Sequence, residues 1–382
     1  MEIWRCLISL GRNRSGLNKP TVITVWNMKK MERLDRFGGI SPALLALGLM
    51  MTGMPSASLQ AEIIEAGPDF LASGDFNGDG KLDVVVVDRA TGRARFGYRV
   101  SAEFFNWVDW RATGVKSVTG ISVGKLVNTG RDGLVVVSAD AGQVAVLDAP
   151  DPKVTTEPTP IATEVLGPNQ VVTIEVGGDG NTPLEDLYVT SIYNSDAENH
   201  VTLFRNDGGD FEQLKDAPAT TVASHARRVV LKPEGTLGVA TIETGTGGSS
   251  WVVQSLATGE PVEVLRLAAV PQGAQSVVGN FRKAKANDVV FFVGGTGELL
   301  VDSLAEIDGQ IKAAPQVKFG LPKAARQVSL AYTRDRPALL AICGTNEPAQ
   351  LLAFDGMSPP TLQQNLAGAS NKVLNAAMFV LT

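Results

Sequence analysis

The residues best suited to chemistry lie in a short turn-rich segment, residues 75–83, which we call the acidic loop. Asp75, Asn77 and Asp79 alternate along it, and Asp83 stands at the ninth position. Side-chain oxygens at positions 1, 3, 5 and 9, together with the backbone carbonyl of Lys81 at position 7, are what a hard Ca²⁺ ion requires. Three carboxylates this close repel one another unless a cation lies between them. The spacing predicts Ca²⁺ as a cofactor.

Two details exclude an EF-hand helix–loop–helix. Position 12 is Val86 where an EF-hand has a bidentate glutamate, and the apolar run 84–87 follows where a helix would begin. The acidic loop is therefore expected between two strands. An Asp/Asn/Gly turn that holds no ion remains the alternative.

A second, weaker candidate for metal binding contains four oxygen-bearing side chains: Asp179, Asn181, Glu185 and Asp186. It departs from the first because Pro183 stands at the middle ligand position. Other loops at corresponding places carry cations where the first has an acid, and these loops are expected to be free of metal; the cations are Lys125, Arg282, Lys283 and Lys285.

The acidic loop belongs to a pattern that returns every 40 to 50 residues or so: an apolar run, a loop rich in Gly, Asn and Asp, and a second apolar run. The copies lie at residues 70–87, 121–137, 171–189, 228–242, 276–292 and 328–342. The runs are short, solidly apolar and without helical periodicity, which favours strands. The fold class expected is all-β, a β-propeller of about six to seven four-stranded blades. A tandem β-sandwich needs a period about twice as long.

The segment 371–381 looks like the first strand of a seventh unit. It either closes the ring against the first blade or leaves a last blade incomplete in a truncated chain.

The run 74–84 resembles an FG-GAP or VCBS repeat, as in integrin-type β-propellers. The close match covers one repeat, and the periodic pattern extends it over residues 62–382. The resemblance implies that Asp75, Asn77, Asp79, the Lys81 carbonyl and Asp83 bind Ca²⁺ between the first two strands of a blade. It implies nothing about any other residue.

The domain organisation follows from one uncharged apolar stretch, residues 40–54, which has basic residues upstream and small residues downstream. This order is typical of a secretory signal peptide, and the stretch is shorter than the roughly 20 residues of a membrane-spanning helix. We predict a signal peptide at 28–61 cleaved near Ala61, a propeller at 62–382, and a start-site artefact or extended n-region at 1–27. The mature chain is expected to lack a membrane span and to be secreted, periplasmic or on the cell surface.

The composition limits the classes of partner and the means of stabilisation that the chain can have. A formal net charge of -6 leaves no basic face for phosphates, so no nucleic-acid partner is expected. The predicted mature chain holds one cysteine, Cys343, so core burial and metal must stabilise it without disulfides.

Few residues suit catalysis. The two histidines, His200 and His225, are expected in loops. Trp107 and Trp110 belong to an aromatic cluster that either stacks on a ligand or packs between blades. We expect an exported, calcium-stabilised binding module for an extracellular protein or polysaccharide. The alternatives are a polysaccharide lyase or hydrolase on the same scaffold, so enzyme activity is left open, and an accessory domain of a longer surface protein.

Overall fold

The computed structural model describes most of the chain. The described residues are 4–11, 22–27, 63–66, 69–101, 104–148, 159–161, 167–176, 184–192, 199–219, 222–232, 237–332, 337–343, 349–366 and 375–381. All regular elements in these ranges are strands, and no described helix is long and apolar enough to cross a bilayer.

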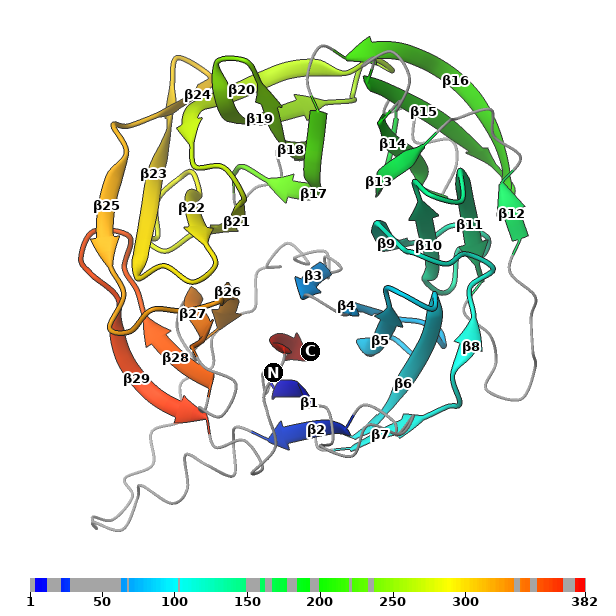
Figure 1. The fold of residues 1–382 in the computed structure, drawn as a ribbon, viewed down its shortest axis with the longest axis horizontal. Coiled ribbons are helices and arrows are strands. Elements are labelled where there is room, and N and C mark those ends of the chain that lie inside the picture. The colour runs from blue at the N-terminus through cyan, green and yellow to red at the C-terminus, as the bar shows by residue number, and fades with distance from the viewer. Residues whose placement is uncertain are drawn as a thin grey trace, which may run out of the picture.

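Six antiparallel sheets, each made of consecutive strands, surround a central axis as the blades of a propeller (Figure 1). Four of these blades have four strands each. The second blade has β9 (Gly120–Gly124), β10 (Gly133–Ser138), β11 (Gln143–Leu147) and β12 (Thr159–Ile161). The third has β13 (Pro168–Ile174), β14 (Asp186–Ile192), β15 (Asn199–Asp207) and β16 (Asp210–Ala219). The fourth has β17 (Val222–Val230), β18 (Leu237–Gly245), β19 (Gly248–Ser255) and β20 (Val262–Val270). The sixth has β26 (Gln327–Tyr332), β27 (Pro337–Ile342), β28 (Ala349–Ala353) and β29 (Thr361–Leu366).

The other two blades are larger. The first blade has six strands: β3 (Ile63–Ala66), β4 (Asp69–Gly74), β5 (Asp83–Asp88), β6 (Arg93–Ser101), β7 (Phe104–Trp107) and β8 (Arg111–Ala112). The fifth has β21 (Ala274–Gly279), β22 (Asp288–Val293), β23 (Glu298–Ile307), β24 (Gln310–Ala313) and β25 (Val317–Gly320). The all-β propeller and its six repeats are confirmed, while uniform four-stranded blades are wrong for the first and fifth.

A seventh, three-stranded sheet joins both ends of the described chain. β30 (Asn375–Leu381) pairs antiparallel with β1 (Trp4–Gly11), which pairs with β2 (Val22–Asn27). β30 also contacts β26 and β27 of the sixth blade. The predicted last strand therefore exists, but its partner is β1, from the segment that the sequence analysis excluded from the fold. The start site and the leader cleavage stay predictions, and a chain cleaved near Ala61 would lose β1 and β2.

The hydrophobic core lies between blades. Four-residue apolar runs form the second strands, and their alternate side chains face opposite neighbours because successive residues of a strand point to opposite faces. Val85 and Val87 pack toward the second blade, in a cluster that contains Phe70, Phe76 and Phe96 of the first blade and Ile121 of the second. Four similar buried clusters join the blades onward from the second to the sixth. This packing fixes each loop against the next blade.

Candidate functional site

The acidic loop joins β4 to β5 in the first blade. Gly74 and Asp83, the residues that bound it, pair directly across the two strands. Gly78 and Gly80 have φ of 75° and 76°, a left-handed conformation that a side chain would strain. The tight strand–loop–strand setting expected from the sequence is therefore present.

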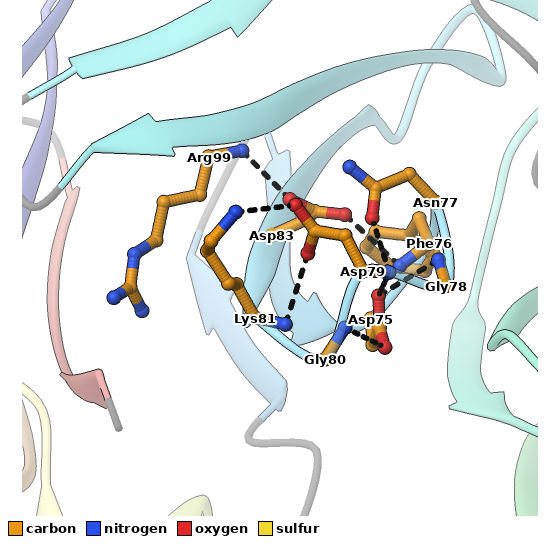
Figure 2. A network of polar contacts seen from close by, with 9 residues as sticks. All are labelled: Asp75, Phe76, Asn77, Gly78, Asp79, Gly80, Lys81, Asp83 and Arg99. Carbon is orange, nitrogen blue, oxygen red and sulfur yellow. Dashed lines mark hydrogen bonds and ion pairs between the residues drawn. The ribbon is translucent and has the colours of Figure 1, made fainter.

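The Asp75 side chain holds the loop together by accepting hydrogen bonds from its backbone. One carboxylate oxygen, Oδ1, accepts hydrogen bonds from the backbone N–H of Gly78 at 2.9 Å and of Asp79 at 3.1 Å. The other, Oδ2, accepts from the N–H of Gly80 at 2.8 Å (Figure 2). These bonds replace those that a strand ladder would supply, because the loop backbone has no partner strand.

Asn77 and Asp79 continue the pattern by a step of two residues. The Asn77 Oδ1 accepts from the Asp79 N–H at 2.9 Å, and the Asp79 Oδ1 accepts from the Lys81 N–H at 3.0 Å. The Lys81 ammonium lies 2.7 Å from the Asp79 Oδ2. Burial acts to raise the pKa of Asp79, but the hydrogen bonds and the charge of Lys81 leave that pKa lowered. The Lys81 ammonium is thus the cation that pairs with Asp79 at the loop.

Asp83 closes the loop from inside the protein, where its side chain is fully buried. Its Oδ2 accepts from the Phe76 N–H at 3.0 Å, and its Oδ1 accepts from the N–H of Arg99 on β6 at 2.7 Å. Burial raises the pKa of Asp83 to about 7; these two hydrogen bonds oppose the rise, and the negative charges of Asp79 and Asp75 add to it. A carboxyl in this position binds a proton readily when no other cation neutralises the site.

The donor set has the right chemistry for Ca²⁺, but its side chains do not converge as the structure stands. No group of three or more His, Cys, Asp or Glu side chains in the described part of the chain is placed to share a metal ion. Asp75 and Asp79 point their oxygens at loop N–H groups and at Lys81 (Figure 2). The Asp75 Oδ1 already accepts two hydrogen bonds, but the Asp75 Oδ2 and both oxygens of Asp79 accept one each and keep a lone pair for an ion. Asp79 would have to move inward, away from Lys81, to bind it.

The second candidate loop has a different construction. Asp179 and Asn181 lie outside the described residues. Asp186 is buried and accepts the N–H groups of Val176 and Asn206 at 2.7 Å and 2.8 Å, the same role that Asp83 has in the first blade. Glu185 forms an ion pair with Arg228 of the fourth blade. Glu185 is thus engaged by a cation between blades.

The fifth blade repeats the buried acid and supplies its own cation. Asp288 begins β22 as Asp83 begins β5, and its side chain is fully buried. The Arg282 Nε lies 2.6 Å from the Asp288 Oδ1. Burial raises the pKa of Asp288, and the hydrogen bonds and charge of Arg282 oppose that rise. In the fifth blade a guanidinium therefore pairs with the buried acid itself, whereas in the first blade Lys81 pairs with Asp79 at the edge of the loop.

Sequence reasoning missed one acid beside the loop, Asp132, which lies just before β10 in the second blade. Its Oδ2 accepts from the Asp75 N–H at 2.7 Å. Burial raises its pKa, the hydrogen bond from Asp75 lowers it, and the charges of Glu185 and Asp75 raise it. The sequence does carry one signal: an acid, Asp132 or Glu185, stands immediately before the second strand of the second and third repeats. Its role can be recognised only when the neighbouring blades are known to be in contact.

The aromatic candidates lie in the outer part of the first blade, Trp107 on β7 and Trp110 just before β8. Trp107, on β7, is partly buried: its ring covers Gly97, and the guanidinium of Arg95 lies 5.6 Å from the ring centroid. Trp110 is partly exposed, and Phe104 has 60% of its surface exposed. Phe104 belongs to the same aromatic cluster as Trp107 and Trp110 and is its most exposed member.

Both histidines lie in strands, so their expected loop setting is wrong. His200 is on β15, where its Nδ1 is 2.8 Å from the Asp216 Oδ2, and Thr202 donates to the other oxygen of Asp216 at 2.9 Å. His225 lies at a bulge in β17 with a φ of 52°.

Comparison with known proteins supports the fold. No family model matches the chain, including any for FG-GAP or VCBS repeats, and no curated protein matches it. A solved structure of a candidate 6-phosphogluconolactonase from Bacteroides uniformis is similar over 99% of this chain and 100% of that one, with 14% identity and a TM-score of 0.52. The periplasmic gluconolactonase PpgL of Pseudomonas aeruginosa is similar over 99% of both chains, with 12% identity and a TM-score of 0.49. The Dos1 propeller covers 77% of this chain and 68% of its own, with 10% identity and a TM-score of 0.47.

At such low identity the first of these structures shows the fold alone. The chain belongs to the class of β-propellers, and the family resemblance of the acidic loop rests on its own residues.

Proposed function

We propose that this protein is an exported β-propeller that binds an extracellular protein or polysaccharide and that Ca²⁺ in the acidic loop stabilises its first blade. Asp75, Asn77, Asp79, the Lys81 carbonyl and Asp83 would hold the ion. When bound, Ca²⁺ would supply the positive charge that the buried end of the loop lacks.

One observation carries the calcium assignment: the Asp83 carboxyl is fully buried beside two further carboxyls, and burial, with a smaller contribution from the charges of Asp79 and Asp75, raises its pKa to about 7. The equivalent acid of the fifth blade, Asp288, contacts a guanidinium, whereas the Asp83 carboxylate accepts hydrogen bonds from the backbone N–H groups of Phe76 and Arg99. A buried charge without a counter-charge is costly, and a divalent cation removes that cost.

Thermal unfolding with calcium and with a chelator tests the assignment. A ligand that binds the native state alone at 100 times its Kd stabilises it by about 2.7 kcal/mol. We expect calcium to raise the Tm of the wild type and to have no effect on Asp79→Ala. Asp302→Asn is the matched control, because Asp302 is also a buried acid but lies in the fifth blade. An unchanged wild-type Tm would show that the loop is a turn without an ion.

The binding role is supported by the outer face of the first blade, where Phe104 is exposed and Trp110 partly so. Aromatic rings that combine an apolar face with exposure suit stacking on sugars or protein side chains. Binding to a glycan array that is lost in Trp107→Ala supports a carbohydrate ligand. Because Trp107 also covers Gly97, Phe104→Ala serves as the companion variant whose folding is at less risk.

Export and catalysis are tested separately. Mass spectrometry of the mature protein tests export. A chain that begins near residue 62 supports the signal peptide, whereas a chain that still contains residues 4–27, and therefore β1 and β2, argues against it. The enzyme alternative gains weight if the purified protein turns over any polysaccharide or, given the fold that it shares with the candidate lactonase, a sugar lactone.

A further inference from the structure

The acidic loop of the first blade is held by the second blade through a reciprocal contact. The Asp132 N–H donates to the carbonyl oxygen of Asp75 at 2.8 Å, and the Asp75 N–H donates to the Asp132 Oδ2 at 2.7 Å. Both backbone polar groups of Asp75 are thus satisfied by one residue of the neighbouring blade. Asp75 occupies position 1 of the loop, so the placement of its carboxylate depends on the contact between the blades.

The fold reserves space for this contact. A Cβ atom on Gly74 would lie 3.0 Å from the Asp132 Oδ2 and 2.7 Å from a methyl carbon of Val123. Any side chain at Gly74 would therefore push Asp132 away from Asp75.

The same contact recurs one junction later, between the second and third blades. The Glu185 N–H donates to the carbonyl oxygen of Lys125 at 2.7 Å, and the Lys125 N–H donates to the Glu185 Oε2 at 3.2 Å. A Cβ atom on Gly124 would overlap the carboxylate of Glu185. At this junction the residue held is Lys125, whose ammonium side chain cannot bind a cation. The same contact between blades therefore occurs twice: it holds an acid, Asp75, at the first junction and a lysine, Lys125, at the second.

We propose that Asp132 is a positioning residue of the calcium site, supplied by the second blade, so that calcium binding and the contact between the first two blades strengthen each other. The inference rests on the proposed function. Asp132 acts through the backbone of Asp75: with that backbone fixed, the carboxylate of Asp75 loses less freedom when an ion binds. By reciprocity of linked equilibria, a bound ion in turn stabilises the junction.

Isothermal titration with CaCl₂ on four proteins tests the inference: wild type, Asp132→Ala, Asp132→Asn and Glu185→Ala. Removing a hydrogen bond to a charged acceptor costs enough to weaken binding about tenfold, which we expect for Asp132→Ala. Asp132→Asn keeps an oxygen that can accept from the Asp75 N–H, so its affinity should stay close to that of the wild type. Glu185→Ala removes the equivalent contact at the next junction. It also removes a charge that acts on Asp132, so its effect on the affinity should be small but not zero, and much smaller than that of Asp132→Ala.

Hydrogen exchange without calcium provides the readout that separates the two proposals. The peptide that contains Asp75 should lose protection in Asp132→Ala and keep it in Glu185→Ala. If the wild type binds no calcium, the proposed function fails, and the exchange result still decides whether Asp132 holds Asp75. Equal loss of calcium affinity in Asp132→Ala and Glu185→Ala would reduce both contacts to general supports of the ring and overturn the inference. Unchanged affinity and exchange in Asp132→Ala would overturn it as well.

Discussion

Calcium binding should release a proton from Asp83, and the amount released should depend on pH. The pKa of Asp83 is raised from 3.8 to about 7 in the calcium-free protein. A carboxyl must be deprotonated to bind a metal, so calcium and the proton compete. At pH 6 about nine in ten calcium-free molecules carry the proton, and at pH 8 about one in ten do. We therefore expect about 0.9 protons released per ion at pH 6 and about 0.1 at pH 8.

The same shift sets the sign of the stability change. Because the folded-state pKa lies above the ordinary value, the stabilising contribution of the protonated carboxyl is complete below about pH 4 and is lost as the pH rises through about 7. Each pKa unit corresponds to about 1.4 kcal/mol, so the calcium-free protein should lose up to about 4 kcal/mol of unfolding free energy from this group across that window. Calcium should restore stability at neutral pH and have little effect at pH 5.

Titration calorimetry in buffers of different ionisation enthalpy measures the protons released. The apparent calcium affinity should fall about tenfold per pH unit below pH 7. Asp83→Asn removes the titrating group and should abolish the pH dependence together with most of the affinity. A calcium affinity that stays level between pH 5.5 and 7.5 in the wild type would refute the coupling and with it the role assigned to Asp83.

Three further predictions concern single side chains. Lys81→Met removes the cation that pairs with Asp79 and leaves this carboxylate free to bind calcium. Because an exposed ion pair is worth at most about 1 kcal/mol, titration should show calcium binding up to about fivefold more tightly. Gly124→Ala should cost about 1–3 kcal/mol in urea unfolding, because its Cβ overlaps a carboxylate of the third blade, whereas Gly247→Ala, which meets nothing within 4 Å, should cost less. Arg282→Met leaves the fully buried Asp288 unpaired and should cost about 3 kcal/mol, and adding Asp288→Asn should recover part of that loss; no recovery would contradict the pairing.

The propeller could be predicted from the sequence because each repeat combines a solid apolar run with a Gly- and Asp-rich turn, and both signals are local. The position of Asp83 at the start of a second strand was readable for the same reason. The number of strands in each blade could not be predicted in this way. β8 pairs with β6, and β25 pairs with β23, although β6 and β23 each already have a partner in their own blade, and no local signal in the sequence marks these additional strands.

Contacts between blades could not be predicted in the same way. Asp132 reaches Asp75 across 57 residues of sequence, and no local pattern shows that these two loops touch. The strand β1 was overlooked because its partner, β30, comes from the other end of the chain. In both cases the missing information is the adjacency of units, which depends on how the repeats close around the axis.

Anomalous scattering from a crystal of the full chain grown with calcium would locate the ion itself. We expect an anomalous peak in the acidic loop, about 2.3–2.6 Å from oxygens of Asp75, Asn77, Asp79 and Asp83 and from the Lys81 carbonyl. A well-ordered loop with no peak, in which Lys81 still pairs with Asp79, would contradict the calcium assignment.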